Sequence, residues 1–233
     1  MSTTTISDLT EFEINYFFVS PDSIRETLTQ IGASQVYPCL KQERYIYTIP
    51  DDIDRVTFQN DITPYLEPGK SQAIIRLLPY GDYLRLRNEG NNTLTLSIKV
   101  HATSGRDMSE QKEAESVISE FESVFPLLKE HGFQCKNVQE NYREKWQLDN
   151  TCSLTIDWWP YLEPYVEIEG DSEEIVRFWG NALGFTDQEK AGEISSTFSS
   201  VSHMYAITYG IAPQVMLDEE YLTFDHRPEW VNQ

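Results

Sequence analysis

Positive charge is scarce in this chain. Its 233 residues include 18 lysines and arginines against 38 aspartates and glutamates, so the formal net charge is -20. Nucleic acids and anionic membranes are both bound through basic surfaces. We therefore expect neither a nucleic-acid partner nor a membrane partner. A local cluster of cations also becomes informative, because cations are rare elsewhere in the chain.

Cysteines and long apolar runs are lacking as well. Cys39, Cys135 and Cys152 are far apart and form no Cys-x-x-Cys motif, so the sequence indicates neither a zinc site nor a disulfide framework. No stretch approaches the apolar length that spans a membrane, and residues 1–8 lack the apolar core of a signal peptide. We expect a protein of the reducing cytoplasm.

Three short stretches carry like charges two residues apart, which are Glu11-Phe12-Glu13, Leu84-Arg85-Leu86-Arg87 and Val166-Glu167-Ile168-Glu169. Side chains i and i+2 share one face of a β-strand, so each stretch predicts a strand with charges on one face and apolar groups on the other. A solvated strand could carry such a pattern at little cost. Two acidic pairs and one basic pair in one domain favour instead a polar interior that binds a ligand with metal and anionic groups.

Alternation and helix-start signals predict a single α+β domain with its core at residues 11–210. Helices are expected to begin at Ser20-Pro21, at Ser119-Glu120 and at Asp171-Ser172, with a short helix at residues 203–209. Residues 51–70 are interpreted as an insertion or long loop, and residues 211–233 as a tail. Strands are expected at residues 11–19, 36–49, 73–78, 83–88, 93–100, 113–117, 138–147, 153–157 and 165–169.

If these strands close around a cavity, two sets of charges point into it. Arginine forks and lysine point charges bind phosphate oxygens. Carboxylates hold Mg²⁺ or Mn²⁺, which bridges to phosphate, so a polyphosphate needs both sets. A structural salt-bridge network is the weaker alternative, because burying so many ions has a desolvation cost of several kcal/mol each. The basic set is Arg85, Arg87, Lys99, Arg143 and Lys145, and the acidic set is Glu11, Glu13, Glu113, Glu115, Asp157, Glu167 and Glu169.

The order of these motifs resembles that of CYTH proteins, the triphosphate tunnel metalloenzymes. This family includes class IV adenylyl cyclases, thiamine triphosphatases and inorganic triphosphatases. The resemblance covers residues 11–210 and rests on the number and order of motifs, which continue through Tyr142-Arg143-Glu144, Asp157-Trp158-Trp159-Pro160 and Tyr165 to Gly170. It implies a closed eight-stranded antiparallel β-barrel with helices packed outside. It also implies a triphosphate-containing small molecule inside the barrel and one or two Mg²⁺ or Mn²⁺ ions.

Matching positions carry the family's roles to this chain. The resemblance implies that Glu11, Glu13, Glu167 and Glu169 are metal ligands with Asp157 nearby, and that Arg85, Arg87, Lys99 and Arg143 bind phosphates. Glu113 and Glu115 would orient these cations or complete the metal shell.

One position departs from the family pattern. The first strand of the family reads Glu-x-Glu-x-Lys, and this chain has Asn15 at the last position. Because that lysine contacts the substrate, the departure leaves the reaction open. Lys145 shares a strand face with Arg143 and is a candidate to replace it, with Lys99 and Arg143 as the other catalytic candidates. The alternative is that Lys145 faces solvent. Arg76 is a further candidate for the tunnel.

The sequence leaves three functions open. Water as the nucleophile would make the protein a metal-dependent triphosphatase, which we favour because hydrolysis demands less of the site. A ribose 3′-hydroxyl as the nucleophile would make it a cyclase that forms cyclic AMP and pyrophosphate from ATP. A protein that only binds a nucleotide or polyphosphate is the third possibility, and a homodimer is left open. Trp158, Trp159 and Tyr161 could stack on a base, although core packing is the commoner role of such residues.

Overall fold

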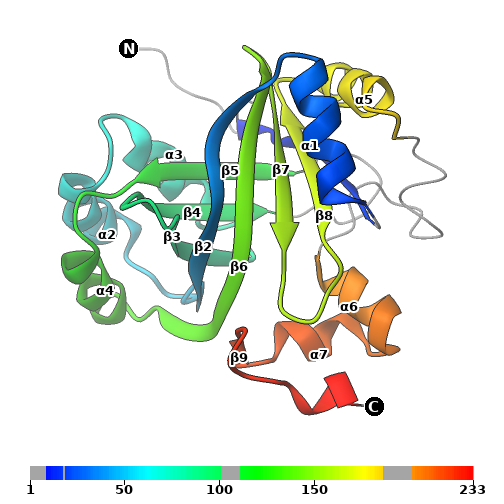
Figure 1. Cartoon of the computed structure of the whole chain (residues 1–233). Helices are drawn as coiled ribbons and strands as arrows, with labels where there is room; N and C mark the ends of the chain where they lie inside the picture. Colours follow the sequence, from blue (N-terminus) through cyan, green and yellow to red (C-terminus); the bar gives the residue numbers. More distant parts are fainter. Residues whose placement is uncertain (1–8, 18, 101–110, 186–200, 233) are drawn as a thin grey trace.

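A strongly curved β-sheet forms the centre of the computed structural model, which describes residues 9–17, 19–100, 111–185 and 201–232 (Figure 1). Eight strands follow one another in the order β1-β8-β7-β6-β2-β3-β4-β5, and each neighbouring pair is antiparallel. The short β9 pairs in parallel with β6. The strands are β1 (Phe12–Tyr16), β2 (Ser34–Thr48), β3 (Tyr83–Asn88), β4 (Leu94–Val100), β5 (Lys112–Val117), β6 (Gln134–Asp149), β7 (Cys152–Trp158), β8 (Tyr165–Gly170) and β9 (Tyr221–Leu222).

The sheet curls until its two edge strands touch at one point. Figure 1 shows β4 and β5 running across the direction of β6 and β7. A single bridge joins Thr10, just before β1, to Lys112 in β5, and the Glu11 N–H donates to the Gln111 carbonyl at 3.1 Å. Within the described ranges no ladder of paired residues joins β1 to β5. The structure therefore shows a curled, eight-stranded antiparallel half-barrel, and the closed barrel that we expected is not confirmed.

The nine helical segments of the described chain pack outside the sheet. Figure 1 shows α2, α3 and α4 on one side, α1 and α5 on the other, and α6 and α7 near the C-terminus. None of these helices has the length and apolar composition needed to cross a bilayer. The segments are α1 (Pro21–Gln30), α2 (Arg55–Ile62), η2 (Thr63–Tyr65), α3 (Lys70–Leu77), α4 (Phe121–Glu130), α5 (Glu173–Ala182), α6 (Val201–Tyr209), α7 (Pro213–Leu217) and η4 (Glu229–Asn232).

Alternation along the strands separates an apolar outer face from a polar inner face. On β1 and β8, Ile14 and Ile168 pack outward against Leu28 of α1 and Val176 of α5. On β3 and β4, the leucines and isoleucines pack outward against α2, α3 and α4 in the same way. The helices thus cover the apolar face, and the polar face is left to line the interior.

The predicted helix starts at Ser20 and Ser172 are confirmed. The Ser20 hydroxyl accepts a hydrogen bond from the Ser23 N–H, and the Ser172 hydroxyl accepts one from the Ile175 N–H. These side chains satisfy amide groups that the first helical turn leaves unpaired. The predicted strand at residues 11–19 is present as β1, although residue 18 lies outside the described residues.

Two expectations about residues 51–78 are wrong. The stretch read as an insertion or loop forms α2 and η2, and the strand expected at residues 73–78 is part of α3. Ala73, Ile74 and Leu77 are buried together, which is the spacing of one helix face. A short apolar run fits both the 3.6-residue period of a helix and the two-residue period of a strand. The pattern therefore could not decide between a helix and a strand. Arg76 lies half-buried on this outer helix, and it is absent from the described residues that line the interior.

The expectation of a C-terminal tail is also wrong. Met216 of α7, Leu222 of β9 and Trp230 of η4 are buried in one cluster with Trp159 and Tyr205. These apolar residues are spaced too irregularly for either period, so the sequence pattern did not reveal that the segment packs.

Hydrogen bonds to a buried carboxylate link α1 to the sheet. Glu144 of β6 accepts hydrogen bonds from Arg25 Nη2 at 2.8 Å, from Gln35 Nε2 at 3.1 Å and from Trp146 Nε1 at 2.7 Å. Its side chain is only 2% exposed, whereas the second carboxylate on Arg25, that of Asp22, is 91% exposed. Because Glu144 is buried and Asp22 is not, we expect the Arg25–Glu144 pair to contribute more to the stability of the fold than the Arg25–Asp22 pair.

We expect Glu144→Gln to lower the free energy of unfolding by about 2–3 kcal/mol, because the amide cannot accept all of these charged and neutral donors. The measurement is urea unfolding followed by tryptophan fluorescence. Asp22→Asn is the matched control, and an exposed ion pair predicts a change below about 0.5 kcal/mol. Equal losses from the two variants would contradict this account.

Candidate active site

A polar cavity of about 1870 Å³ lies inside the curled sheet. All the predicted metal-binding, phosphate-binding and catalytic residues line it except Asp157, which is fully buried. This volume exceeds that of an ordinary small-ligand pocket, which is roughly 300–1,000 Å³. The interior therefore has room for an extended ligand together with ions.

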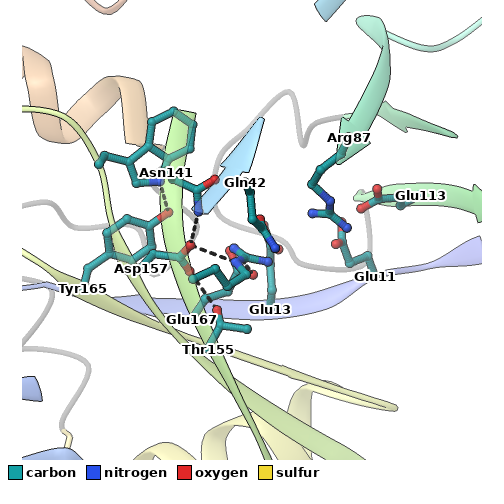
Figure 2. Close-up of polar contacts among 12 residues, drawn as sticks. Glu11, Glu13, Gln42, Arg87, Glu113, Asn141, Thr155, Asp157, Tyr165 and Glu167 are labelled. Atoms are coloured by element: carbon teal, nitrogen blue, oxygen red, sulfur yellow. Dashed lines mark hydrogen bonds and ion pairs between the residues drawn. The ribbon is translucent and has the colours of Figure 1, made fainter. Parts of the chain in front are cut away.

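Strand register gathers carboxylates on one wall of the cavity. Glu13 of β1 lies opposite Glu169 of β8, and Asn15 lies opposite Glu167 in the same ladder. All four side chains line the cavity because residues two apart share a strand face. The bridge between Thr10 and Lys112 brings β5 next to this wall, and Figure 2 shows Glu11 and Glu113 close together there.

Lys99 of β4 neutralises part of the acidic wall. Its Nζ lies 2.8 Å from Glu11 Oε2 and 3.1 Å from Glu13 Oε1. Burial alone would lower the pKa of Lys99, but the charges of Glu11 and Glu13 outweigh it and raise that pKa well above its usual value. Lys99 thus stays charged between the two carboxylates.

The acidic wall has the chemistry of a site for a hard cation. Burial raises the pKa of Glu11 well above its usual value, with the charge of Glu13 adding to the effect. Burial also raises the pKa of Glu13. The pKa of Glu113 falls despite its burial, because Arg85 and Lys99 both lie close to it. A divalent cation would relieve this crowding of carboxylates, and Mg²⁺ and Mn²⁺ take oxygen ligands of this kind.

No three histidine, cysteine or acidic side chains converge as a ready metal site in the part of the chain that is described. Ion pairs to lysine and arginine hold the carboxylates instead. The residues fit a divalent cation by their donor type and their crowding, and the cation would replace Lys99 as the partner of the acidic wall.

Three arginines form the facing wall, and each holds carboxylates. Arg85 Nη2 lies 2.7 Å from Glu113 Oε1, and Arg87 Nη2 lies 2.9 Å from Glu115 Oε2. Arg87 Nε also contacts Glu89 Oε1 at 2.6 Å. Arg143 Nη2 lies 3.1 Å from Glu167 Oε1, across β7. These ion pairs neutralise most of the charge on the side chains that line the cavity.

Asp157 fixes the orientation of Arg143. Its Oδ1 accepts from Arg143 Nε at 2.8 Å and from Asn141 Nδ2 at 2.7 Å, and its Oδ2 accepts from Thr155 Oγ1 at 2.8 Å. Figure 2 shows Asn141 and Thr155 pointing at this carboxylate from either side. Both oxygens are occupied, so in this structure Asp157 positions the arginine.

Asn15 and Lys145 both line the cavity. Asn15 is buried, and its Oδ1 accepts no hydrogen bond from the described residues. Lys145 is half-buried, and its charge attracts Glu169, whose side chain is exposed. The placement of Lys145 agrees with the first of the two interpretations, in which it shares the inner face with Arg143.

Sequence reasoning missed Arg44 of β2, which also lines the cavity. Its Cζ lies 4.8 Å from the ring centroid of Trp159. The signal was present, because Gln42 and Arg44 are two apart on a predicted strand and share its inner face. It was obscured because the outward residues Lys41 and Glu43 are equally polar.

Comparisons with known proteins agree with this geometry. A family model described as the CYTH domain matches residues 77–194, and the chain belongs to this family. No curated protein matches the chain in sequence.

Several solved structures share the fold. The PH1012 protein of Pyrococcus horikoshii OT3 aligns with a TM-score of 0.53 and 16% identity over 76% of this chain and 92% of its own. A conserved hypothetical protein from Pyrococcus furiosus aligns with a TM-score of 0.50 and 19% identity over the same shares of the two chains. HpAC1 from Hippeastrum, which has a dominant triphosphatase activity, aligns with a TM-score of 0.46 and 14% identity over 87% of this chain and 97% of its own. At these identities the first two likenesses show the fold alone.

We expect Asp157→Asn to lower the free energy of unfolding by about 3 kcal/mol, because the change breaks a buried charge pair with Arg143. The comparison is Thr155→Val, which removes a single neutral donor to the same carboxylate and should cost about 1 kcal/mol. Chemical denaturation of both variants measures the difference. A Thr155→Val loss as large as that of Asp157→Asn would contradict the assignment of Asp157 as the anchor of Arg143.

Proposed function

We propose that this protein is a metal-dependent triphosphatase, which hydrolyses a triphosphate-containing small molecule inside the curled sheet. The observation that carries the proposal is the meeting of several carboxylates and several arginines in one cavity. A polyphosphate with its metal ion needs both, since carboxylates bind the cation and arginines bind the phosphate oxygens. Membership of the CYTH family supports the same substrate class.

Glu11, Glu13, Glu167 and Glu169 are the proposed ligands of Mg²⁺ or Mn²⁺. The ion would supply charge neutralisation and Lewis acidity at the phosphate chain. The mutual repulsion of these four carboxylates favours a cation with more than one charge. Asp157 lies near these ligands but is not proposed to bind the metal directly, because Arg143, Asn141 and Thr155 already donate hydrogen bonds to its oxygens.

Arg85, Arg87 and Arg143 are the proposed phosphate-binding residues, with Lys99. Each exchanges a carboxylate partner for a phosphate oxygen when the substrate enters. The exchange conserves charge pairing, so it avoids the cost of leaving a buried ion alone. Preorganised cations that face the developing charge also stabilise the transition state of phosphoryl transfer. Glu113 and Glu115 hold Arg85 and Arg87 in place before binding.

The aromatic residues favour hydrolysis over cyclase chemistry. Trp158 lies beneath the guanidinium of Arg25, Trp159 beneath that of Arg44, and Tyr161 beneath that of Arg227. The three rings that the sequence offered as base-stacking surfaces are therefore each engaged by an arginine. A cyclase must hold its nucleobase and ribose in register with the phosphates, whereas a triphosphatase needs only the chain of phosphates.

The purified protein should release orthophosphate from tripolyphosphate when Mg²⁺ or Mn²⁺ is present and release none in EDTA. The assay panel adds ATP and thiamine triphosphate and measures orthophosphate, pyrophosphate and cyclic AMP. Cyclic AMP with pyrophosphate as the products would identify a cyclase instead. Metal-dependent binding with no product from any substrate would leave a binding protein and remove the enzyme assignment.

Two variants test the two walls separately. We expect Arg87→Gln to lower kcat/KM by about 10²–10³, because it removes a cation aimed at the phosphates. We expect Glu13→Gln to raise the metal concentration at half-maximal activity by more than about 10-fold, because it removes a proposed ligand. Glu43→Gln is the control, since this residue is on β2 but faces away from the cavity. An unchanged kcat/KM in Arg87→Gln would rule out the tunnel assignment.

A further inference from the structure

Arg44 is a buried cation that pairs with no carboxylate among the residues that the structure describes. It sits in the middle of β2, opposite Arg87 of β3 and Gln139 of β6, and is 7% exposed. Its Nε and Nη2 make no hydrogen bond to any described residue. Arg85, Arg87 and Arg143, which lie in the same cavity, each hold at least one carboxylate.

The surroundings of Arg44 are electrostatically unfavourable. Burial lowers its pKa to about 10, and the like charges of Arg143, Arg85 and Arg87 add to this effect. The group nevertheless stays charged at neutral pH. A buried cation among other cations destabilises the ligand-free fold, and an anion bound among them would reverse that effect.

The Trp159 ring contacts the flat face of the Arg44 guanidinium, so the ring does not use the N–H groups on the guanidinium edge. The ring stacks on Arg44 at 4.8 Å, and its own Nε1 donates to Tyr165 Oη at 3.1 Å, which fixes the ring. A cation–π contact uses the plane of the guanidinium, so the N–H groups in that plane remain free to donate. Nε and Nη2 point the same way along one edge, which is the geometry that binds two oxygens of one phosphate.

We propose that Arg44, held on Trp159, is a substrate-binding residue that takes one phosphate group of the bound chain through Nε and Nη2. The inference rests on the proposed function, because it takes the ligand to be a polyphosphate. The phosphate would lie between β2, β3 and β6, where Arg143, Arg85 and Arg87 are the cations that act on Arg44. Arg44 thus adds a positive charge that forms no ion pair with a carboxylate of the described residues.

The test measures binding and stability in the same variants. Binding of diimidotriphosphate, a tripolyphosphate analogue with nitrogen at both bridging positions, is followed by calorimetry in Mg²⁺. We expect Arg44→Met to weaken it by about 10- to 100-fold, the loss of a pair of charge-assisted hydrogen bonds. The same change should raise the thermal midpoint of the ligand-free protein by about 2–4 °C, because an unpaired buried charge is removed. A purely structural arginine would lower that midpoint.

Arg227→Met is the matched control. Arg227 also stacks on an aromatic ring, at 5.5 Å from that of Tyr161, but it is exposed and does not line the cavity. We expect its affinity for the analogue to equal that of the wild type. Arg44→Lys keeps the charge without the fork, so it should bind several-fold more weakly than the wild type, and it decides the question if Arg44→Met does not fold.

The outcomes separate this inference from the proposed function. Wild-type affinity in Arg44→Met, or in Arg44→Lys where the first variant is unfolded, would overturn the role of Arg44 and leave the triphosphatase proposal intact. A lower midpoint in a folded Arg44→Met would also overturn it. Failure of the wild-type protein to bind the analogue would contradict the proposed function itself, and this inference with it.

Discussion

Mutual neutralisation of buried charges is the interaction on which this structure depends. The sheet curls so far that its inner face, which alternation makes polar, is removed from water. Lys99 illustrates the consequence, because it belongs to β4 and yet binds Glu11 and Glu13 on the opposite edge of the sheet. Among the described residues a single backbone bridge, from Thr10 to Lys112, links the two edges of the sheet, and these ion pairs join the edges as well. The closure of the cavity is therefore partly ionic.

This arrangement makes ligand binding an exchange of partners. Lys99, which now holds Glu11 and Glu13, and Arg143, which holds Glu167, become available to phosphate only as those carboxylates find another cation. Under the proposed function a metal ion supplies that cation. Binding of the metal then frees cationic side chains for phosphate, and binding of phosphate frees carboxylates for the metal. Two ligands that do this bind cooperatively, and the coupling is reciprocal.

The sequence predicted which charged side chains share the inner face better than it predicted the elements around them. The period of two in a strand is strict, so charges at i and i+2, as in Arg85 and Arg87, were correctly assigned to one face. The prediction for residues 73–78 failed because a short apolar run fits both the helix period and the strand period. The packed C-terminal segment and the incomplete pairing of β1 with β5 depend on contacts between distant parts of the chain. Arg44 was missed because its strand is polar on both faces.

The charge balance of the cavity explains how Asn15 is tolerated. It lies opposite Glu167 in the β1–β8 ladder, where CYTH proteins of the expected pattern have a lysine. Glu167 does not need that lysine, because Arg143 lies 3.1 Å away and lowers its pKa despite burial, with help from Lys99 and Arg44. The positive charge absent from the first strand is present on the second, at Arg44, on the other side of the cavity. A neutral residue at position 15 therefore moves a charge within the cavity without reducing the total that faces an anionic ligand.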